Sequence, residues 1–538
     1  MTESERRPRG LTRKELIGGG ASAAAAALLA TQGSGVERAL AAAKGKRKDV
    51  AGMNIILFIT DQERGIQHFP QNWLRQNLPG MRRLRQHGLS FERAFTNACM
   101  CSPARSTLMS GLFPAQHGVK YTLEEDMTDT EVNPQVNLPT DIANLATVMK
   151  GAGYKVIYKG KWHCSKPATS GQAEPSDLEK YGFDRWNPPD AGANQSVPEA
   201  GGGFIDNDGR FVNSTGEGKE EGILQYLDTH AAQEQPFFMV ISLVNPHDVL
   251  FYPSRTFTEA GYDESWLPGD IDIPQTNEED LSMKPTVQEE FLKIFNLTGK
   301  PSSKAEKRAY LNYYGNLMRS SDSYLVNVLD KLEQRGLYDK TLIVRTADHG
   351  EMGLTHGGLR QKNFNFYEEA TRVPLVYSNP KLFPHPTKSE ALVSHVDFLP
   401  TLASLAAAPK SARAEWQGVD YSKLVLNPSS GGSVQDYVVF TYDDFQSGQK
   451  NGPYPKPPNH IVSIREGRWK LAKYHDTNPE VKKRKPPQWE MYDLKTDPLE
   501  QHNIAHPEAK RTPQQEEELK RLKAKLARVE KTRLKEPS

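Results

Sequence analysis

Four short apolar runs in the chain have the pattern of strands buried on both faces. They are MNIILFIT (53–60), YKVIYKG (154–160), PFFMVISLV (236–244) and TLIVRTA (341–347). Each is continuous rather than alternating, as is typical of parallel strands inside an α/β sheet. Segments with a helical pattern lie between them. In the clearest, 311–336, Gly336 suits the helix end, and the apolar face comprises Leu311, Tyr314, Met318, Ser321, Leu325, Val328 and Leu332.

This alternation of strands and helices predicts a doubly wound α/β sheet. The pattern changes near Ala408, where runs such as DYVVFTY and HIVSIREGRWKLAKY indicate short antiparallel strands. We therefore predict a large N-terminal α/β domain over 44–410 and a smaller α+β domain over 411–538. The second domain should end in an amphipathic packing helix whose apolar stripe is Leu519, Leu522, Leu526 and Val529.

Two stretches rich in Gly, Pro and charge, 165–222 and 252–306, have the composition of surface insertions, where substrate selection often resides. The whole chain of 538 residues is 37% hydrophobic and 25% charged, as in a soluble globular protein. A formal net charge of +1 does not indicate a protein that binds nucleic acid. Three cysteines exclude a disulfide framework, although Cys99 and Cys164 could pair in an oxidising compartment or stay unpaired.

The N-terminal segment, 1–43, has the pattern of an export signal. Basic residues precede an apolar run over 17–30 that is too short to span a bilayer comfortably, and ALAAA ends at Ala43 with small residues suited to cleavage. The residues Thr12-Arg13-Lys14-Glu15-Leu16 look like a twin-arginine signal with Arg-Lys in place of Arg-Arg. We expect an exported protein, periplasmic or secreted, without a stable membrane span. The alternative is an Ala-rich disordered tail.

Polar side chains follow each of the four predicted strands. The strand ends read Thr60-Asp61-Gln62, Lys159-Gly160-Lys161-Trp162-His163, Asn245-Pro246-His247 and Ala347-Asp348-His349-Gly350. Because the carboxyl ends of strands form the ligand crevice of open α/β sheets, these groups should converge. Two carboxylates, an amide oxygen and an imidazole suit a hard divalent cation, and the candidate ligands are Asp61, Gln62, Asp348 and His349. Taken singly, each could instead be a strand-end turn residue.

A second set of side chains is cationic or can become so: Lys161, His163, His247 and Lys362. Beside a metal ion they would surround an anion such as a sulfuryl or phosphoryl group. Each could also be structural, although the Gly-Lys-Trp-His cluster at 160–163 is harder to explain in that way.

Cys101 stands where a helix is predicted to begin. Ser102 can cap that helix and Pro103 suits its first position, so residue 101 should lie at a helix N-terminus that favours anions. The residue types alone indicate either a thiolate nucleophile with a lowered pKa or a buried, inert cysteine. Neither interpretation explains why Pro103 and Arg105 accompany it.

The stretch CSPARSTLMSG resembles the sulfatase signature Cys-x-Pro-x-Arg with its continuation, and GYKVIYKGKWH resembles the second signature of that family. NIILFITDQ, PFFMVISLVNPH, TADHGEMGLTHGGLRQKNFNFYEEATRVPLV, VSHVDFLPTL and WEMYDLKTDPLEQHNIA resemble further family segments in the same order. The resemblance covers nearly the whole chain after the export signal. It implies a large, mixed, mostly parallel sheet of the alkaline-phosphatase type and the hydrolysis of a sulfate monoester, from a sulfated small molecule or carbohydrate.

The resemblance also implies that Cys101 is oxidised to formylglycine by a formylglycine-generating enzyme. The hydrate of this aldehyde, held on a divalent metal ion, would be the nucleophile. By position, the metal ligands are Asp61, Gln62, residue 101, Asp348 and His349, with Ca²⁺ expected first and Mg²⁺ or Mn²⁺ as alternatives. Arg105 would stabilise the hydrate, while Lys161, His163, His247 and Lys362 would hold the sulfate. His163 would serve as the base for sulfate elimination, and His247 or Lys362 would protonate the leaving group.

Two departures from the commonest family pattern keep an alternative open. Many sulfatases have Asp-Asp where this chain has Asp61-Gln62, and Asp-Asn where it has Asp348-His349. Both variants resemble choline-sulfatase-like and phosphonate-hydrolase-like branches. The alternative is therefore a phosphodiesterase or phosphonate monoester hydrolase with the same formylglycine. That branch lacks the pair formed here by Lys161 and His163, which favours a sulfatase. A non-catalytic anion-binding relative is a third hypothesis, but no predicted ligand is lost.

Overall fold

The computed structural model describes residues 50–124, 127–130, 133–168, 173–192, 207–217, 220–229, 235–477 and 484–536. From Val50 onward the chain forms one compact unit. The predicted export signal over 1–43 lies outside the described residues. Within the described ranges, no helix has both the length and the apolar character needed to cross a membrane.

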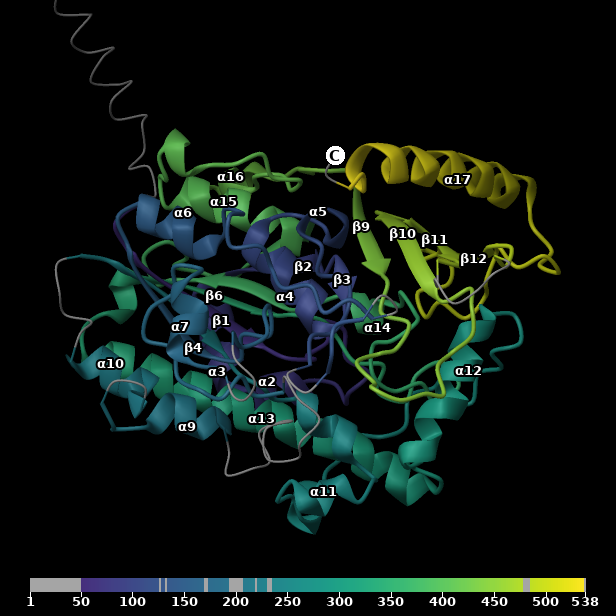
Figure 1. Ribbon diagram of the computed structural model, residues 1–538, viewed down its shortest axis with the longest axis horizontal. Helices are drawn as coiled ribbons and strands as arrows, with labels where there is room; N and C mark the ends of the chain where they lie inside the picture. The colour runs from purple at the N-terminus through teal and green to yellow at the C-terminus, as the bar shows by residue number, and fades with distance from the viewer. Residues whose placement is uncertain are drawn as a thin grey trace, which may run out of the picture. The chain divides into compact units, whose positions relative to one another are not determined.

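The larger of two sheets has seven strands, and its centre confirms the predicted α/β class (Figure 1). The four apolar runs form neighbouring parallel strands, and an antiparallel β7 makes the sheet mixed. In spatial order the strands are β4 (Lys155–Gly160), β5 (Phe237–Ser242), β1 (Asn54–Thr60), β6 (Thr341–Ala347), β7 (Leu375–Ser378), β2 (Gly88–Phe95) and β8 (Thr387–Ser394).

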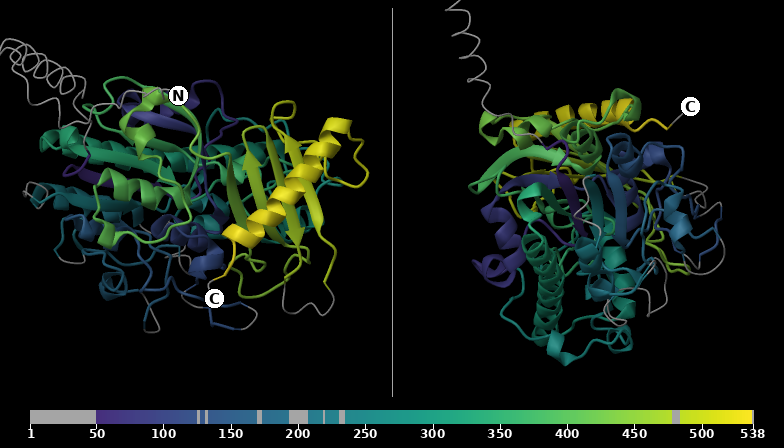
Figure 2. Two further views of the ribbon diagram at one scale, coloured as in Figure 1. Left: turned by 90° about the horizontal axis from the view of Figure 1, so that it is seen from above. Right: turned by 90° about the vertical axis from the view of Figure 1, so that its left-hand side faces the viewer.

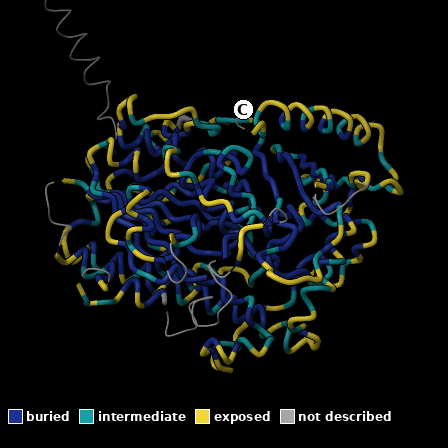
Figure 3. Tube along the Cα trace, in the orientation of Figure 1, coloured by how far each residue is buried: buried dark blue, intermediate teal, exposed yellow. Residues whose placement is uncertain are grey.

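Helices cover both faces of this sheet, which is why its strands read as continuous apolar runs. On β1, Ile55 and Leu57 face one core, whereas Ile56 and Phe58 face the other. The first core includes residues of α4 (Cys101–Ser110), α6 (Leu145–Gly151), α7 (Pro175–Glu179), α15 (Phe398–Leu405) and α16 (Ser422–Leu426). The second includes residues of α2 (Trp73–Asn77), α3 (Pro79–Gln86), α9 (Asn207–Asn213), α10 (Ile223–Thr229) and α13 (Lys304–Gln334). Figure 3 shows the sheet strands buried throughout this interior.

The helix predicted over 311–336 is α13, and it begins earlier than the apolar pattern indicated. Its start is set by Ser303, whose hydroxyl accepts a hydrogen bond from the Glu306 backbone N–H at 3.1 Å. The Glu306 carboxylate accepts one in return from the Ser303 N–H at 2.9 Å, which completes a capping box. At the other end Gly336 adopts a φ of 63°, as expected of a glycine that follows a helix.

The second sheet has five strands and carries the C-terminal helix on one face. Its order is β12 (Gln488–Asp493), β11 (Trp469–His475), β10 (His460–Glu466), β9 (Tyr437–Tyr442) and β3 (Ala98–Cys99). The helix α17 (Pro513–Arg533) lies across these strands in Figure 2. The predicted stripe, Leu519, Leu522, Leu526 and Val529, is buried there against residues such as Ile464 and Leu471.

The edge strand β3 joins the second sheet to the residues that lead into Cys101. Ala98 pairs with Thr441, and Cys99 pairs with Tyr442. The other face of this sheet packs on 364–370 and on α12 (Thr286–Phe295). A boundary between 410 and 411 stays a prediction, but the second sheet directly supports segments of the site.

The prediction that 165–222 is a surface insertion is wrong for part of this stretch. Among its described residues, Tyr181, Phe183 and Trp186 are buried. Trp162 packs against two of them, with ring centroids 5.1 Å from Tyr181 and 5.5 Å from Phe183. The Gly, Pro and charge content of the stretch masked these aromatic side chains, which fill the core beneath β4.

Candidate active site

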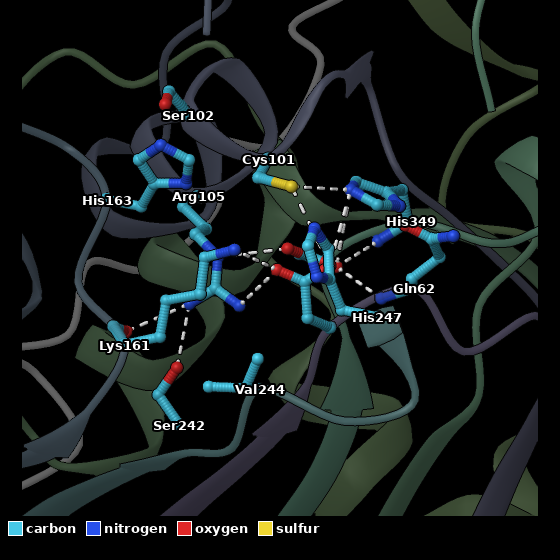
Figure 4. A network of polar contacts seen from close by, with 12 residues as sticks. Gln62, Cys101, Ser102, Arg105, Lys161, His163, Ser242, Val244, His247 and His349 are labelled. Carbon is cyan, nitrogen blue, oxygen red and sulfur yellow. Dashed lines mark hydrogen bonds and ion pairs between the residues drawn. The ribbon is translucent and has the colours of Figure 1, made fainter. Parts of the chain in front are cut away.

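The predicted site residues meet at the carboxyl ends of four neighbouring strands, β4, β5, β1 and β6 (Figure 4). Asp61 and Gln62 follow β1, and Asp348 and His349 follow β6. Lys161 and His163 follow β4, and His247 begins the short 3₁₀ helix η3 (His247–Phe251) after β5. The crevice rule for open α/β sheets is therefore confirmed here, since parallel strands bring their ends to one edge.

Cys101 is the first residue of α4, as predicted for a helix N-terminus. The residue before it, Met100, is extended and occupies the cap position. The expectation that Ser102 caps the helix is wrong, because its hydroxyl instead accepts a hydrogen bond from the Leu123 N–H at 3.0 Å. Burial, reinforced by the carboxylate of Asp61, raises the pKa of the Cys101 thiol to about 12. The protein groups around this sulfur therefore do not favour a thiolate.

Four ligand atoms that suit a metal ion lie within 4.8 Å of one another, all on buried residues: Asp61, Cys101, Asp348 and His349. The Cys101 Sγ is 3.2 Å from His349 Nε2 and 3.6 Å from Asp61 Oδ1. His349 Nδ1 lies 3.2 Å from the Gly350 carbonyl oxygen, so the imidazole directs Nε2 at the cluster. Burial and the cationic Lys362 hold the pKa of His349 well below its usual range, which keeps the imidazole neutral and able to bind a cation.

The Arg105 guanidinium lies beneath the cluster and joins its two carboxylates. Its Nε donates to Asp348 Oδ2 at 2.9 Å, and Nη2 donates to Asp61 Oδ2 at 3.2 Å. Nη1 donates to the Lys161 carbonyl oxygen at 3.0 Å and to Ser242 Oγ at 2.7 Å. Each of the three guanidinium nitrogens therefore donates a hydrogen bond, in a planar geometry that a lysine could not reproduce.

The two carboxylates differ in their electrostatic surroundings. Burial by itself would raise the pKa of Asp61, but Lys161, whose Nζ lies 2.7 Å from Asp61 Oδ2, and other cations hold it well below its usual range. Burial and the facing Asp61 carboxylate raise the pKa of Asp348. Two carboxylates placed this close in a buried site repel each other, and a divalent cation between them would reduce that repulsion.

Two site residues other than glycine adopt the left-handed backbone region, Gln62 with a φ of 67° and His163 with a φ of 55°. Such conformations cost free energy and concentrate where a side chain must be aimed. Gly160 is needed for a related reason. A Cβ on Gly160 would lie 2.0 Å from the Ser242 carbonyl oxygen, so only glycine permits β4 and β5 to approach there.

The other predicted anion-binding residues surround the cluster in different ways. Lys362 Nζ donates to Gln62 Oε1 at 2.6 Å. His163 lies on the far side of Arg105 in Figure 4, with Nε2 2.5 Å from the Leu123 carbonyl oxygen. His247 lies over the carboxylates, with Nδ1 3.6 Å from Asp248 Oδ1. Burial and Lys161 lower the pKa values of both histidines.

Sequence reasoning missed three residues that hold the site in place. Ser242 Oγ accepts a hydrogen bond from Arg105, and Glu351 Oε2 accepts one from the Gln62 side-chain amide at 2.6 Å. Asp190 accepts hydrogen bonds from the backbone N–H groups of Trp162 at 2.7 Å and His163 at 2.8 Å. The position of Glu351, two residues after His349, was the available signal. We find no comparable signal for Asp190.

The three cysteines, Cys99, Cys101 and Cys164, are free and buried. Of the two alternatives left open for Cys99 and Cys164, paired or unpaired, the structure therefore shows the unpaired one.

Comparison with known proteins shows the family to which the chain is similar. Residues 53–408 match the family model described as Sulfatase, and residues 356–532 match N-sulphoglucosamine sulphohydrolase, C-terminal. An ulvan-active sulfatase of Formosa agariphila is 25% identical over 407 residues, covering 74% of this chain and 70% of that protein. Choline-sulfatase of Rhizobium meliloti is 26% identical over 470 residues, covering 84% and 82%.

Solved structures show the same fold. A 2-O GAG sulfatase superposes with a TM-score of 0.65 at 18% identity, covering 89% of this chain and 92% of that one. A phosphonate monoester hydrolase of Agrobacterium radiobacter superposes with a TM-score of 0.59 at 21% identity, covering 88% and 96%. Both likenesses confirm an α/β architecture of the predicted type.

Proposed function

Since this chain belongs to the sulfatase family, whose members hydrolyse sulfate esters, we propose that it cleaves a sulfate monoester of a carbohydrate with a nucleophile derived from Cys101. The observation that carries the proposal is the buried group of Asp61, Cys101, Asp348 and His349, with ligand atoms within 4.8 Å. A family resemblance could survive the loss of activity, but this chain keeps the complete set of reactive groups in one place.

The residues fit a divalent metal ion. Asp61, Asp348 and the amide oxygen of Gln62 are hard oxygen donors, and His349 presents a neutral Nε2. This donor set favours Ca²⁺, with Mg²⁺ or Mn²⁺ as alternatives. When bound, such a cation supplies Lewis-acid stabilisation of the negative charge that develops at residue 101.

We assign the thiol of Cys101 to maturation rather than to catalysis. With a pKa raised to about 12, it is a poor nucleophile among these protein groups, whereas Pro103 and Arg105 complete the frame that a formylglycine-generating enzyme would read. Addition of water to the formylglycine aldehyde would give a hydrate with two geminal hydroxyls, one to attack sulfur and one to drive sulfate release.

The cationic side chains suit the binding of a sulfate group. Lys161 and Lys362 are buried beside the cluster, where the ammonium group of Lys161 contacts Asp61 and that of Lys362 contacts Gln62. Arg105 lies below residue 101 and would stabilise negative charge there. In a site closed to water these charges act more strongly than at the surface.

The two histidines suit proton transfer in different steps. Because His163 Nε2 is engaged with the Leu123 carbonyl oxygen, the Nε2–H tautomer leaves Nδ1 as an acceptor, which fits a base for sulfate elimination. His247 is 8% exposed, the most open of the site histidines, so we place it on the leaving-group side as the acid. Lys362 is the alternative acid.

The proposed substrate class rests on the relatives. The ulvan-active sulfatase and the 2-O GAG sulfatase are named for sulfated polysaccharides, and both align over most of this chain. We extend that class to this chain. Export through the predicted signal at 1–43, to the periplasm or the exterior, would bring the enzyme to such substrates.

A second candidate, hydrolysis of a phosphonate monoester or phosphodiester, is favoured by the Asp61-Gln62 pair and by the likeness to the phosphonate monoester hydrolase. The presence of both Lys161 and His163 favours the sulfate monoester. The deciding experiment is a turnover panel of sulfated sugars, 4-nitrophenyl sulfate and a phosphate diester. We expect sulfate release at the higher kcat/KM. A phosphate diester cleaved at a comparable or higher value would reverse the assignment.

A further inference from the structure

We infer that Glu351 is a positioning residue that fixes the side-chain amide of Gln62, so that its oxygen rather than its nitrogen faces the cation site. The inference rests on the proposed function, because it concerns the metal ion that Gln62 would help to hold. Glu351 lies outside the predicted ligand set, and its side chain is completely buried.

The chemistry of the two neighbours determines the amide orientation. Gln62 Nε2 donates to Glu351 Oε2 at 2.6 Å, and Gln62 Oε1 accepts from Lys362 Nζ at 2.6 Å. An ammonium group has only donors and an ionised carboxylate only acceptors. Rotating the amide by 180° would place its NH₂ against the Lys362 ammonium and its oxygen against the Glu351 carboxylate. Only one orientation is therefore compatible with both neighbours.

Glu351 is itself fixed by donors on its other oxygen. The hydroxyl of Tyr310 donates to Oε1 at 2.6 Å, and the backbone N–H groups of Gly353 and Gln361 each donate at 3.0 Å. All three contacts require Oε1 to accept, which leaves Oε2 for Gln62. The carboxylate thus has little freedom to follow a different amide orientation.

The backbone of Gln62 is fixed as well, which leaves the amide plane as the element that Glu351 controls. The Gln62 N–H donates to Asp348 Oδ1 at 3.0 Å, and its carbonyl oxygen accepts from the Tyr314 hydroxyl at 2.9 Å. Asp348 is a predicted metal ligand, so any shift of the Gln62 backbone would also disturb a second ligand.

This arrangement explains how a glutamine can stand where many sulfatases have a second aspartate. An amide ligand carries one negative charge fewer than a carboxylate. The Glu351 carboxylate restores that charge on the far side of the Gln62 amide, where it hydrogen-bonds to Nε2. This hydrogen bond polarises the amide, so that Oε1 becomes a stronger ligand for a hard cation. A carboxylate at position 62 would instead face Glu351 directly in a buried site.

The test is the affinity for Ca²⁺ alone, measured by isothermal titration calorimetry on the full purified chain. Glu351→Gln and Gln62→Glu each create a mismatched pair, amide against amide or carboxylate against carboxylate. We expect each to weaken Ca²⁺ binding by about 10- to 100-fold, as is typical when the partner of a metal ligand is lost. The double variant Gln62→Glu/Glu351→Gln restores one carboxylate and one amide, and should return to within about threefold of the unaltered chain.

Glu490→Gln is the matched control. Glu490 is also a buried carboxylate that accepts from a glutamine, with Gln288 Nε2 at 3.1 Å, and from a tyrosine, with the Tyr474 hydroxyl at 2.6 Å. It lies on β12 in the second sheet, so its substitution should leave Ca²⁺ affinity unchanged. A general effect of disturbing a buried Glu–Gln–Tyr group would appear in this control.

The outcomes separate this inference from the proposed function. If the unaltered chain binds no Ca²⁺ and releases no sulfate, the proposed function fails. If it binds Ca²⁺ and turns over a sulfate ester, but Glu351→Gln binds Ca²⁺ equally well, only the role of Glu351 is overturned. If Glu351→Gln does not fold, the double variant decides: recovery of folding and Ca²⁺ binding supports the pairing, and failure of either refutes it.

Discussion

The Arg105 guanidinium and the Asp348 carboxylate form a completely buried ion pair, with Nε 2.9 Å from Oδ2, although 243 positions separate them in the chain. Arg105 belongs to α4, and Asp348 follows β6. The pair therefore ties the helix that begins at Cys101 to the edge of the large sheet. It also sets the distance between residue 101 and the carboxylates that would bind the metal ion.

Removing the guanidinium should destabilise the fold as well as stop turnover. Arg105→Ala leaves Asp61 and Asp348 buried without a shared partner, and breaking such a pair typically costs about 3–5 kcal/mol of the free energy of unfolding. Urea denaturation of the metal-free chain measures this cost. Arg105→Lys, which keeps the charge but not the fork, should lose less stability and still lose turnover. An alanine variant as stable as the unaltered chain would contradict the structural role.

Substitution of Cys101 should abolish activity with little effect on stability. We expect Cys101→Ala to lower kcat/KM for a sulfate ester by about 10⁴-fold or more, because the reactive group itself is lost. Cys99→Ala is the matched control, since Cys99 is also free and buried but lacks the Cys-x-Pro-x-Arg frame. Peptide mass mapping of active enzyme should find an aldehyde at position 101. A thiol there in fully active protein would sink the proposed mechanism.

The role of His247 can be tested by varying the leaving group. If His247 protonates the departing oxygen, His247→Ala should lower kcat/KM for a sulfated sugar by about 10²–10⁴-fold. The kcat/KM for 4-nitrophenyl sulfate should fall much less, because its leaving group needs no proton. The measurement is kcat/KM for both substrates. Equal losses for both would assign His247 to sulfate binding and leave Lys362 as the acid.

A buried histidine outside the site should make stability depend on pH. Burial alone would lower the pKa of His356, but its contacts with Glu279, 2.8 Å from Nδ1, and Glu369, 3.7 Å from Nε2, raise it to about 9. The same carboxylates also meet Lys284 and His68, at 2.9 Å and 2.7 Å respectively.

Because the folded chain binds this proton more tightly than the unfolded chain, the stabilisation is complete below pH 6.5 and disappears as the pH rises through about 9. It amounts to about 3 kcal/mol, at about 1.4 kcal/mol for each pKa unit. The free energy of unfolding of the unaltered chain should therefore exceed that of His356→Gln by an amount that shrinks across this range. A difference that is independent of pH would contradict the assignment.

The sequence predicted the central strands and their reactive ends because both follow from local patterns. Continuous apolar runs identified the strands, and the rule for parallel sheets brought Asp61 and Asp348 together. The supporting residues could not be found in this way. Gln62 and Glu351 lie 289 positions apart, and His163 and Asp190 belong to different loops. Their pairing depends on three-dimensional packing that no local pattern encodes.

The core beneath β4 shows a second feature that local sequence patterns did not predict, namely which side chains of a polar stretch are buried. Tyr181, Phe183 and Trp186 lie in a stretch whose average composition is polar, yet all three are buried, and Tyr181 and Phe183 pack against Trp162. Composition describes the mean of a segment, whereas packing depends on individual side chains. The cap of α4 was misassigned for a similar reason, because the Ser102 hydroxyl is used by Leu123 from another segment.

The burial of α4 puts the proposed maturation in competition with folding. Only 2% of the Cys101 surface is exposed, and every residue of this helix is buried. If residue 101 is modified as proposed, the modifying enzyme has to reach it before the helix packs, so Cys101 would stay a thiol in any chain that folds first and remains folded. The active fraction of a preparation would then be decided during synthesis, by the ratio of two rates, and later exposure to the modifying enzyme would not change it.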